Sequence, residues 1–277
     1  MGYEAKIILD SINKVGNRLT TFEITYPRIV HNELMTHRMF SRNSSSSRAI
    51  PNVRLISKIF EDPFVPTYWG KNQKGMQAEE ELSIEIQGEA VLKWIEARDI
   101  MLQYSKELSN LGIHKQIVNR LLEPWMWITV VVTATEYDNF FYLRCHKDAQ
   151  PEIQKIAYMM KELYDNNKPK ELKSGSWHLP YIWQEDLEDK ESFEDKDLRL
   201  VSAARCARVS YLTHNGIRDI SEDLRLATQL LEGEVKHISP FEHQAKALGE
   251  NLRYGNFFGW KQFRKYFEDE NYGKILG

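Results

Sequence analysis

Alternating apolar and polar residues predict a strand near the start of the chain. Phe22, Ile24 and Tyr26 fall on one face of residues 20–26, a segment rich in β-branched and aromatic side chains. Residues 125–133 combine tryptophan, isoleucine, threonine and valine in a run of similar length. Because these residue types suit a pleated, half-buried surface, both segments are expected to be strands.

Apolar residues at helical spacing predict more helix than sheet. The ranges expected to be helical are 29–39, 77–110, 115–122, 138–142, 151–164, 198–209, 221–231 and 256–267. A further short strand is expected at 243–248, and residues 51–76, which prolines and glycines interrupt, are expected to be irregular. The acidic run at 184–197 is expected to be a solvated connector. This balance of elements indicates an α+β fold.

Composition narrows the class of protein. The chain has 277 residues, 42% of them hydrophobic and 28% charged, with a formal net charge of −3. That charge argues against general binding to nucleic acid, which uses a basic excess. No apolar run approaches the roughly 20 residues that span a bilayer, and the first residues lack the pattern of a signal peptide. With two cysteines, neither a disulfide framework nor a zinc site is expected. We therefore expect a cytoplasmic protein that binds no metal, nucleic acid or membrane.

The chemistry of the chain is concentrated in residues 36–48, which read Thr-His-Arg-Met-Phe-Ser-Arg-Asn-Ser-Ser-Ser-Ser-Arg. Three arginines, a histidine, an asparagine and five serines supply many hydrogen-bond donors and few acceptors. Guanidinium groups suit phosphate, and serine hydroxyls and backbone amides add further donors. The segment therefore indicates a site for an anionic ligand such as a nucleotide.

This segment resembles the signature of the flavin-dependent thymidylate synthases. That signature is Arg-His-Arg, two residues, Ser, one residue, Asn, two residues, Ser, one residue and Arg, and only Thr36 departs from its fixed positions. Three further blocks, at 112–120, 139–144 and 149–153, are similar to family segments that follow the signature. The resemblance implies a small mixed or antiparallel sheet with several long helices, in a single domain over residues 1–277.

Two other family blocks stand in an unusual order. Residues 207–211 and 237–243 resemble motifs that normally precede the signature, but here they follow it. The simplest explanation is a circularly permuted chain, in which the family's usual ends are joined through residues 165–200. Permutation of this kind is tolerated where chain ends lie close together at the surface.

The resemblance implies an activity and its cofactors. The family transfers a one-carbon unit from methylenetetrahydrofolate to C5 of dUMP and forms dTMP, with FAD as the redox cofactor and NADPH as the reductant. It implies a homotetramer whose sites lie between subunits. The residues leave two alternatives open. One is a related enzyme that methylates or hydroxymethylates another pyrimidine nucleotide, such as UMP or dCMP. The other is a catalytically silent nucleotide-binding relative.

The resemblance also assigns roles to residues. Arg144 is expected to polarise the uracil ring and is one candidate catalytic residue. Ser46, at the second serine of the signature, is the other; with no base beside it, we expect it to bind rather than attack. The residues expected to bind substrate are Glu33, Ser44, Ser45, Ser46, Ser47, Arg48, Arg120 and Arg144. Those expected to bind the flavin are His37, Arg38, Asn43, Asn139, Ser210, His237, Ser239 and Glu242.

Several departures from the family leave details open. Thr36 removes a guanidinium beside the flavin, and Glu33 and Asp148 replace residues that are usually uncharged or basic, so the acceptor nucleotide and the affinity for flavin are not fixed. Cys145 and Cys206 are expected to be packed small residues rather than nucleophiles. The aromatic loops within 51–76 and 174–183 are candidates to face the folate pterin.

Overall fold

A five-stranded sheet forms the centre of the computed structural model, which describes residues 2–188, 195–211, 219–232 and 236–267. The strand order is β3-β4-β2-β1-β5, and every neighbouring pair is antiparallel except β1 and β5, which are parallel. The strands are β1 (Glu4–Asn13), β2 (Arg18–Pro27), β3 (Ser41–Ser44), β4 (Trp127–Ala134) and β5 (Lys170–Leu172). The predicted α+β fold with a small mixed sheet is confirmed.

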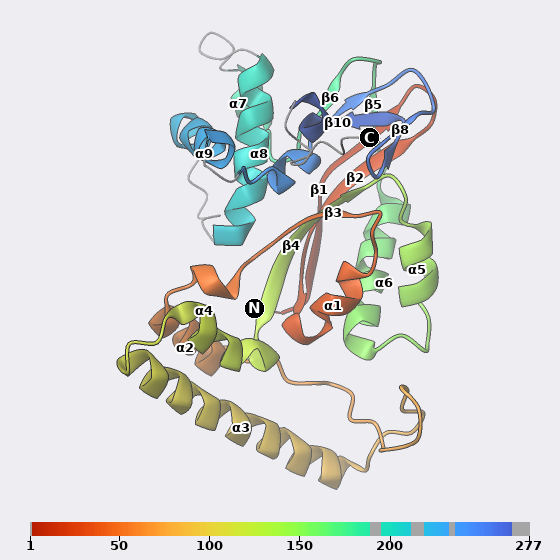
Figure 1. Cartoon of the computed structure of the whole chain (residues 1–277). Helices are drawn as coiled ribbons and strands as arrows, with labels where there is room; N and C mark the ends of the chain where they lie inside the picture. The colour runs from red at the N-terminus through yellow and green to blue at the C-terminus, as the bar shows by residue number, and fades with distance from the viewer. Residues whose placement is uncertain (1, 189–194, 212–218, 233–235, 268–277) are drawn as a thin grey trace, which may run out of the picture.

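One face of this sheet carries the main hydrophobic core. Phe22 and Ile24 of β2 lie opposite Val132 and Val130 of β4, as the predicted alternation requires. These side chains pack against α5 (Asp138–Arg144) and α6 (Pro151–Asn166), the latter through residues such as Ile156. Figure 1 shows both helices on the same side of the sheet. Because these side chains are fully buried, each stabilises the fold by roughly 1.5–3 kcal/mol.

The opposite face carries a second layer, built from the C-terminal part of the chain. Its helices are α7 (Gln184–Glu188), α8 (Asp195–Tyr211) and α9 (Ile220–Glu232), followed by the 3₁₀ helices η4 (Ser239–Glu242) and η5 (Phe263–Tyr266). Its strands are β6 (Trp177–His178), β7 (Ala245–Ala247), β8 (Arg253–Tyr254), β9 (Phe257–Phe258) and β10 (Trp260–Gln262). Cys206 and Val209 of α8 pack on Val131 of β4. This layer therefore places the two C-terminal family blocks over the edge of the sheet that β3 forms.

A third group of helices lies at one end of the sheet (Figure 1). It comprises α2 (Asn52–Glu61), α3 (Ile84–Asn110), α4 (Lys115–Val118) and the 3₁₀ helix η3 (Asn119–Trp125). Leu55 and Ile59 of α2 pack with Leu102 of α3 and Leu122 of η3. The segment between β2 and β3 forms η1 (Arg28–Val30) and α1 (His31–Met35), and η2 (Ser47–Ala49) ends the signature. No helix among the described residues is both long and apolar enough to cross a bilayer.

Two expectations from the sequence are wrong. Residues 51–76 are not irregular throughout, because α2 occupies 52–61 and presents one apolar side to α3. Residues 256–267 are not a helix but two short strands and a 3₁₀ helix. Their aromatic side chains Phe257, Trp260 and Phe263 are buried in two different clusters, which a single helical face does not allow.

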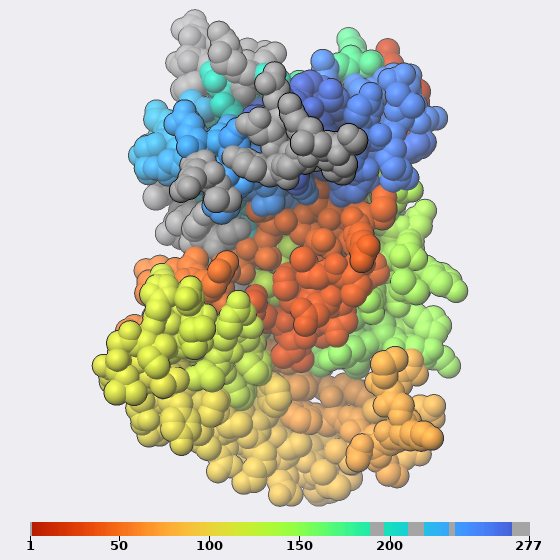
Figure 2. Space-filling model, in the orientation of Figure 1, coloured from red at the N-terminus to blue at the C-terminus, as the bar shows by residue number. Residues whose placement is uncertain are grey.

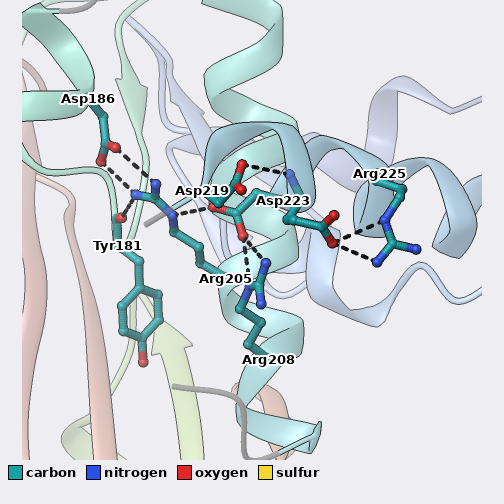
Figure 3. A network of polar contacts seen from close by, with 8 residues as sticks. Tyr181, Asp186, Arg205, Arg208, Asp219, Asp223 and Arg225 are labelled. Atoms are coloured by element: carbon teal, nitrogen blue, oxygen red, sulfur yellow. Dashed lines mark hydrogen bonds and ion pairs between the residues drawn. The ribbon is translucent and has the colours of Figure 1, made fainter. Parts of the chain in front are cut away.

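The acidic run also differs from the expected solvated connector, at least in the part that the structure describes. Asp186 of α7 is buried and forms an ion pair of 2.6 Å with Arg205 of α8. Arg205 also donates to Asp223 of α9 at 2.8 Å, and Arg208 pairs with the same carboxylate at 2.7 Å. Figure 3 shows this network between the helices. It holds α7, α8 and α9 together, because buried charges of this kind are stable only when paired.

Candidate active site

A cavity of about 620 Å³ lies where the signature meets the C-terminal layer, α4 and the start of η3. Four distant parts of the chain line it. The lining residues are Arg28, His31, Arg42, Asn43, Ser44, Ser45, Ser46, Ser47, Arg48, Ala49, His114, Gln116, Arg120, Ala207, Leu230, His237, Ser239 and Pro240. In Figure 2 the signature segment (red to orange) lies between the yellow-green residues that follow α3 and the blue C-terminal residues. Residues of the signature and of the blocks at 112–120, 207–211 and 237–243 therefore meet at this cavity within one chain.

The serines of the signature are held by hydrogen bonds to neighbouring elements. The Ser45 N–H donates to the Thr129 carbonyl at 2.8 Å, and its hydroxyl accepts from the Thr129 N–H at 3.1 Å. The Ser47 hydroxyl donates to Glu123 at 2.9 Å, and the Asn119 amide donates to the Ser47 carbonyl at 2.7 Å. These contacts extend the pairing of β3 with β4 beyond the strand. They fix the backbone along which Ser44 and Ser46 are only partly buried.

The lining of the cavity is cationic. Four arginines, at 28, 42, 48 and 120, line it together with three histidines, and no carboxylate is among its described lining residues. Glu123 lies behind the lining, where it pairs with Arg28 at 3.0 Å and with Arg120 at 3.4 Å. A concave surface with this charge attracts anions and suits a phosphate group.

Arg42 is a cavity residue that sequence reasoning did not select. Its Nη1 donates to the carbonyls of Met35 and His37, both at 3.0 Å, so it closes the turn after α1. Burial lowers the pKa of Arg42, and the nearby Glu242 opposes that shift. Because Arg42 occupies a variable position of the signature, the family resemblance assigned it no role.

His31 and Arg28 were also missed, because they precede the signature. The Tyr26 hydroxyl lies 2.7 Å from Nδ1 of His31. Burial, reinforced by Arg28 and Arg42, lowers the pKa of His31 to about 4. His31 is therefore a neutral imidazole at pH 7, able to offer one donor and one acceptor.

Arg144 and His37 form a second polar group, outside the cavity lining. The Arg144 Nε donates to Nε2 of His37 at 3.0 Å, and its Nη2 donates to the Thr36 hydroxyl at 3.3 Å and the Glu33 carbonyl at 3.4 Å. Burial, followed by Arg144 and Arg42, lowers the pKa of His37 to about 4. The His37 ring also packs edge-on against Phe140, with 4.9 Å between ring centroids. Arg42 links this group to the cavity through the His37 carbonyl.

The structure thus divides the predicted site residues. Those that line the cavity are Asn43, Ser44, Ser45, Ser46, Ser47, Arg48, Arg120, His237 and Ser239. Those that do not line it are Glu33, His37, Arg38, Asn139, Arg144 and Glu242. One chain alone therefore does not bring all these side chains into one cavity, and their convergence between subunits stays a prediction. Glu242 instead pairs with Arg264, Arg38 and Asn139 are exposed, and the Ser210 side chain lies outside the described residues.

Both cysteines pack as expected. Cys206 is fully buried, and burial raises the pKa of its thiol far above the ordinary value. Cys145 is partly buried against the main core, and burial raises the pKa of its thiol as well. A raised pKa disfavours the thiolate that a cysteine nucleophile needs.

The two aromatic loops differ in their surroundings. Trp177 packs against Phe263 and Tyr266, and the Tyr181 hydroxyl donates to Glu23 at 2.6 Å, so the loop at 174–183 is part of the C-terminal layer. In the other loop, Trp69 packs against Trp94. Gln77, just after that loop, donates to the Asp148 carbonyl at 3.2 Å, so this loop approaches the connection that follows Arg144.

Comparison with known proteins decides the family. A family model described as "Thymidylate synthase complementing protein" matches residues 19–170, which is more than half of the chain. The chain belongs to this family. The matched region contains the central strands, the signature, η3 and α5, whereas the blocks at 207–211 and 237–243 lie beyond it. The permuted order of the thymidylate synthase complementing protein motifs stays a prediction, although Ala207, His237 and Ser239 do reach the cavity.

Individual relatives are distant. A flavin-dependent thymidylate synthase of Aquifex aeolicus (strain VF5) is 30% identical over 152 residues, which cover 52% of this chain and 44% of that protein. The chain thus matches less than half the length of this curated relative. Among solved structures, the UMP/dUMP methylase PolB of Streptomyces cacaoi bound with 5-Br UMP has a TM-score of 0.49 and 16% identity, covering 58% of this chain and 88% of that one. The same methylase bound with 5-Br dUMP has a TM-score of 0.42 and 19% identity, covering 53% and 65%.

Proposed function

We propose that the chain is a flavin-dependent thymidylate synthase that transfers a one-carbon unit to C5 of a pyrimidine nucleotide, with dUMP as the acceptor. The observation that carries the proposal is the cationic cavity that the signature serines, Arg48 and Arg120 line together. The membership of the chain in the thymidylate synthase complementing protein family supports the same function. A nucleoside monophosphate brings the phosphate that such a lining accommodates.

Arg48 and Arg120 are the proposed phosphate ligands. They line the cavity from η2 and η3, and both are exposed. Ser44 and Ser46 line the same cavity and supply hydroxyl donors. This arrangement binds the phosphate from several directions, which orients the nucleotide as well as retaining it. Among the described residues, no histidine or carboxylate is hydrogen-bonded to the Ser46 hydroxyl, in keeping with a binding role.

FAD is the proposed redox cofactor, and the group around His37 is its proposed site. Neutral His37 offers a flat ring and Arg144 a guanidinium, and the two are hydrogen-bonded to each other. The Glu33 carboxylate has one buried oxygen, Oε2, without a hydrogen-bond partner among the described residues. A flavin ring, which carries both an N–H donor and carbonyl acceptors, fits this set of groups. When bound, the flavin supplies the electrons that the one-carbon transfer needs, while Arg144 stabilises negative charge on the pyrimidine.

The remaining participants come from the family resemblance. Methylenetetrahydrofolate would donate the carbon and NADPH would reduce the flavin. A homotetramer is the proposed assembly, because the cavity and the His37 group are separate within one chain and would be completed by residues of other copies. Exposed apolar side chains of α2 and α3 support an assembly. Among them are Val53 (80% exposed), Ile84 (84%) and Leu92 (71%).

The test is an anaerobic assay of the purified protein. We expect bound flavin whose absorbance bleaches with NADPH, followed by conversion of dUMP to dTMP with methylenetetrahydrofolate, read by mass spectrometry. UMP and dCMP in parallel reactions identify the acceptor, and the mass of the product distinguishes a methyl from a hydroxymethyl group. Protein that binds nucleotide but neither retains flavin nor forms product with any acceptor would establish the silent relative that Thr36 makes conceivable.

A further inference from the structure

A continuous chain of buried hydrogen bonds runs across the sheet and ends at the cavity. It links one residue on each of β1, β2, β4 and β3 with two histidines of the C-terminal layer. The links are Ser11 Oγ to His178 Nδ1 (2.9 Å), His178 Nε2 to Thr21 Oγ1 (2.9 Å), Thr21 Oγ1 to Thr133 Oγ1 (2.8 Å), Thr133 Oγ1 to His243 Nδ1 (2.8 Å) and His243 Nε2 to the Asn43 amide (3.0 Å). Only Asn43 lines the cavity.

This series of hydrogen bonds is closed to solvent at its Ser11 end. Ser11 is 1% exposed, and the two threonines and two histidines are fully buried. The hydrogen bonds therefore do not carry protons between the cavity and solvent. Burial lowers the pKa of both His178 and His243 to about 3, so each imidazole is neutral and carries a single proton. Each link then holds one hydrogen, and fixing the direction of one link fixes the direction of all of them.

The Asn43 end sets that direction. The amide atom that faces His243 Nε2 also lies 3.2 Å from the Ser239 carbonyl oxygen and 3.2 Å from the Arg42 carbonyl oxygen. Carbonyl oxygens only accept, so this amide atom is the nitrogen Nδ2. His243 Nε2 consequently accepts, and Nδ1 carries the proton and donates to Thr133. By the same reasoning Thr133 donates to Thr21, Thr21 donates to His178 Nε2, and His178 Nδ1 donates to Ser11.

We propose that this series of buried hydrogen bonds fixes the orientation of the Asn43 amide. It holds the Asn43 side-chain oxygen at the cavity as a hydrogen-bond acceptor for an N–H or O–H donor of the bound nucleotide. The proposal rests on the function proposed above. His243 and Thr133 are positioning residues in it, since neither lines the cavity. Because Nδ2 faces three acceptors, His243 Nε2 and two carbonyl oxygens, rotation of the amide would turn Oδ1 toward acceptors alone. The amide therefore does not flip, and the Asn43 oxygen rather than its nitrogen is presented to the ligand.

The central experiment replaces Thr133 in the full-length protein. Thr133→Val keeps the shape of the side chain but removes the acceptor of His243 Nδ1–H, whereas Thr133→Ser keeps the hydroxyl. We expect the valine variant to bind dUMP about tenfold more weakly, which corresponds to about 1.4 kcal/mol of binding free energy. The serine variant should keep most of the wild-type affinity. Equal affinity of the two variants would overturn the proposal.

A second measurement is independent of nucleotide and of the stability of any variant. Ring ¹⁵N resonances of wild-type protein are expected to place the proton on Nδ1 in both His178 and His243, and a proton on Nε2 of either would contradict the assigned direction. If the tautomers are as expected but no pyrimidine nucleotide binds, the proposed function itself fails. If dUMP binds but the tautomers differ, only this inference fails.

A ligand series identifies the donor that Asn43 accepts from. dUMP methylated at N3 lacks the imide N–H, and a nucleotide without the 3′-hydroxyl lacks the sugar donor. Weakened binding of one analogue in wild-type protein, with no further loss in Asn43→Ala, assigns the contact to the group that this analogue lacks. Full additivity of the analogue and Asn43→Ala effects for both analogues would exclude a direct contact.

Discussion

Arg144 donates from Nε to Nε2 of His37 across 3.0 Å, which joins α5 to the turn before β3. Because arginine only donates, this ring nitrogen carries no proton, and the single proton of neutral His37 is on Nδ1. The pair connects the residue expected to contact the uracil with one expected to contact the flavin. It also explains how Thr36 is accommodated, since the Arg144 guanidinium occupies the space beside this short side chain and donates to its hydroxyl.

Replacing Arg144 is expected to separate catalysis from flavin binding. In Arg144→Ala the charge that stabilises a negative pyrimidine is lost, so turnover should fall by about 10²-fold or more. Flavin should stay bound even though Arg144 is part of its proposed site, because His37 and its support from Phe140 remain. Flavin content by absorbance and dTMP formation by mass spectrometry measure the two effects. Intact turnover in a variant that has lost its flavin would contradict the roles proposed here.

Stability is expected to fall in mild acid because four histidines are held neutral. The pKa of His31 and of His37 is lowered from 6.5 to about 4, and that of His178 and of His243 to about 3, in each case chiefly by burial. Below pH 6.5 the unfolded chain takes up protons that the folded chain does not, so the free energy of unfolding decreases as the pH falls. The loss continues to about pH 4 for the first pair and about pH 3 for the second.

The slope of this dependence can be measured by urea denaturation. Near pH 5, unfolding should take up roughly four protons from these histidines. His37→Asn should reduce that number by about one. An unfolding free energy that does not change between pH 6.5 and pH 5 would mean that these imidazoles are already charged in the folded protein.

The sequence predicts best those elements in which apolar residues recur at one regular spacing. The strand at β2 and the helix at α6 each have a clear apolar face, and the structure places both within two residues of the expected ends. β3 was not foreseen, because its sequence Ser-Arg-Asn-Ser has no hydrophobic alternation. It is a strand because its backbone pairs with β4, and its side chains serve the cavity and the buried hydrogen-bond chain.

The candidate site was predictable only where the chain resembles the family. The signature led to Arg48 and the serines and the block at 112–120 led to Arg120, and these residues share a cavity. Arg28 and His31 were not found, because nothing in a one-dimensional pattern says that the end of β2 will lie beside η3. Asp186 looked like one more residue of a solvated acidic run. Its burial depends on Arg205, a residue outside that run, so local composition did not reveal it.

Arg42 and Arg48 are expected to differ although both line the cavity. Arg48→Met removes an exposed guanidinium and should weaken dUMP binding about tenfold. Arg42→Met should weaken dUMP binding to a similar degree. It should also weaken flavin binding, because the carbonyls of Met35 and His37 lose their shared donor and the backbone that carries the His37 ring is released. Dissociation constants for dUMP and FAD in both variants test this, and identical flavin affinity would refute a linking role for Arg42.

The buried network of α7, α8 and α9 is expected to decide the stability of the C-terminal layer. Asp223 is fully buried and accepts from Arg205 at 2.8 Å and from Arg208 at 2.7 Å (Figure 3). In Asp223→Asn the buried Arg205 keeps Asp186 but loses Asp223, and the partly buried Arg208 loses the same carboxylate, so the free energy of unfolding should fall by about 3–5 kcal/mol. Urea denaturation with circular dichroism measures this change.

Arg225 provides the matched control, because it pairs with Glu222 on the same helix as Asp223 but with both side chains more than half exposed. Arg225→Met should therefore cost no more than about 1 kcal/mol. Since α8 and α9 bring Ala207 and Leu230 to the cavity wall, Asp223→Asn should also weaken dUMP binding, while Arg225→Met should not. A cost for Asp223→Asn as small as that of the control would mean that the buried carboxylate does not hold these helices together.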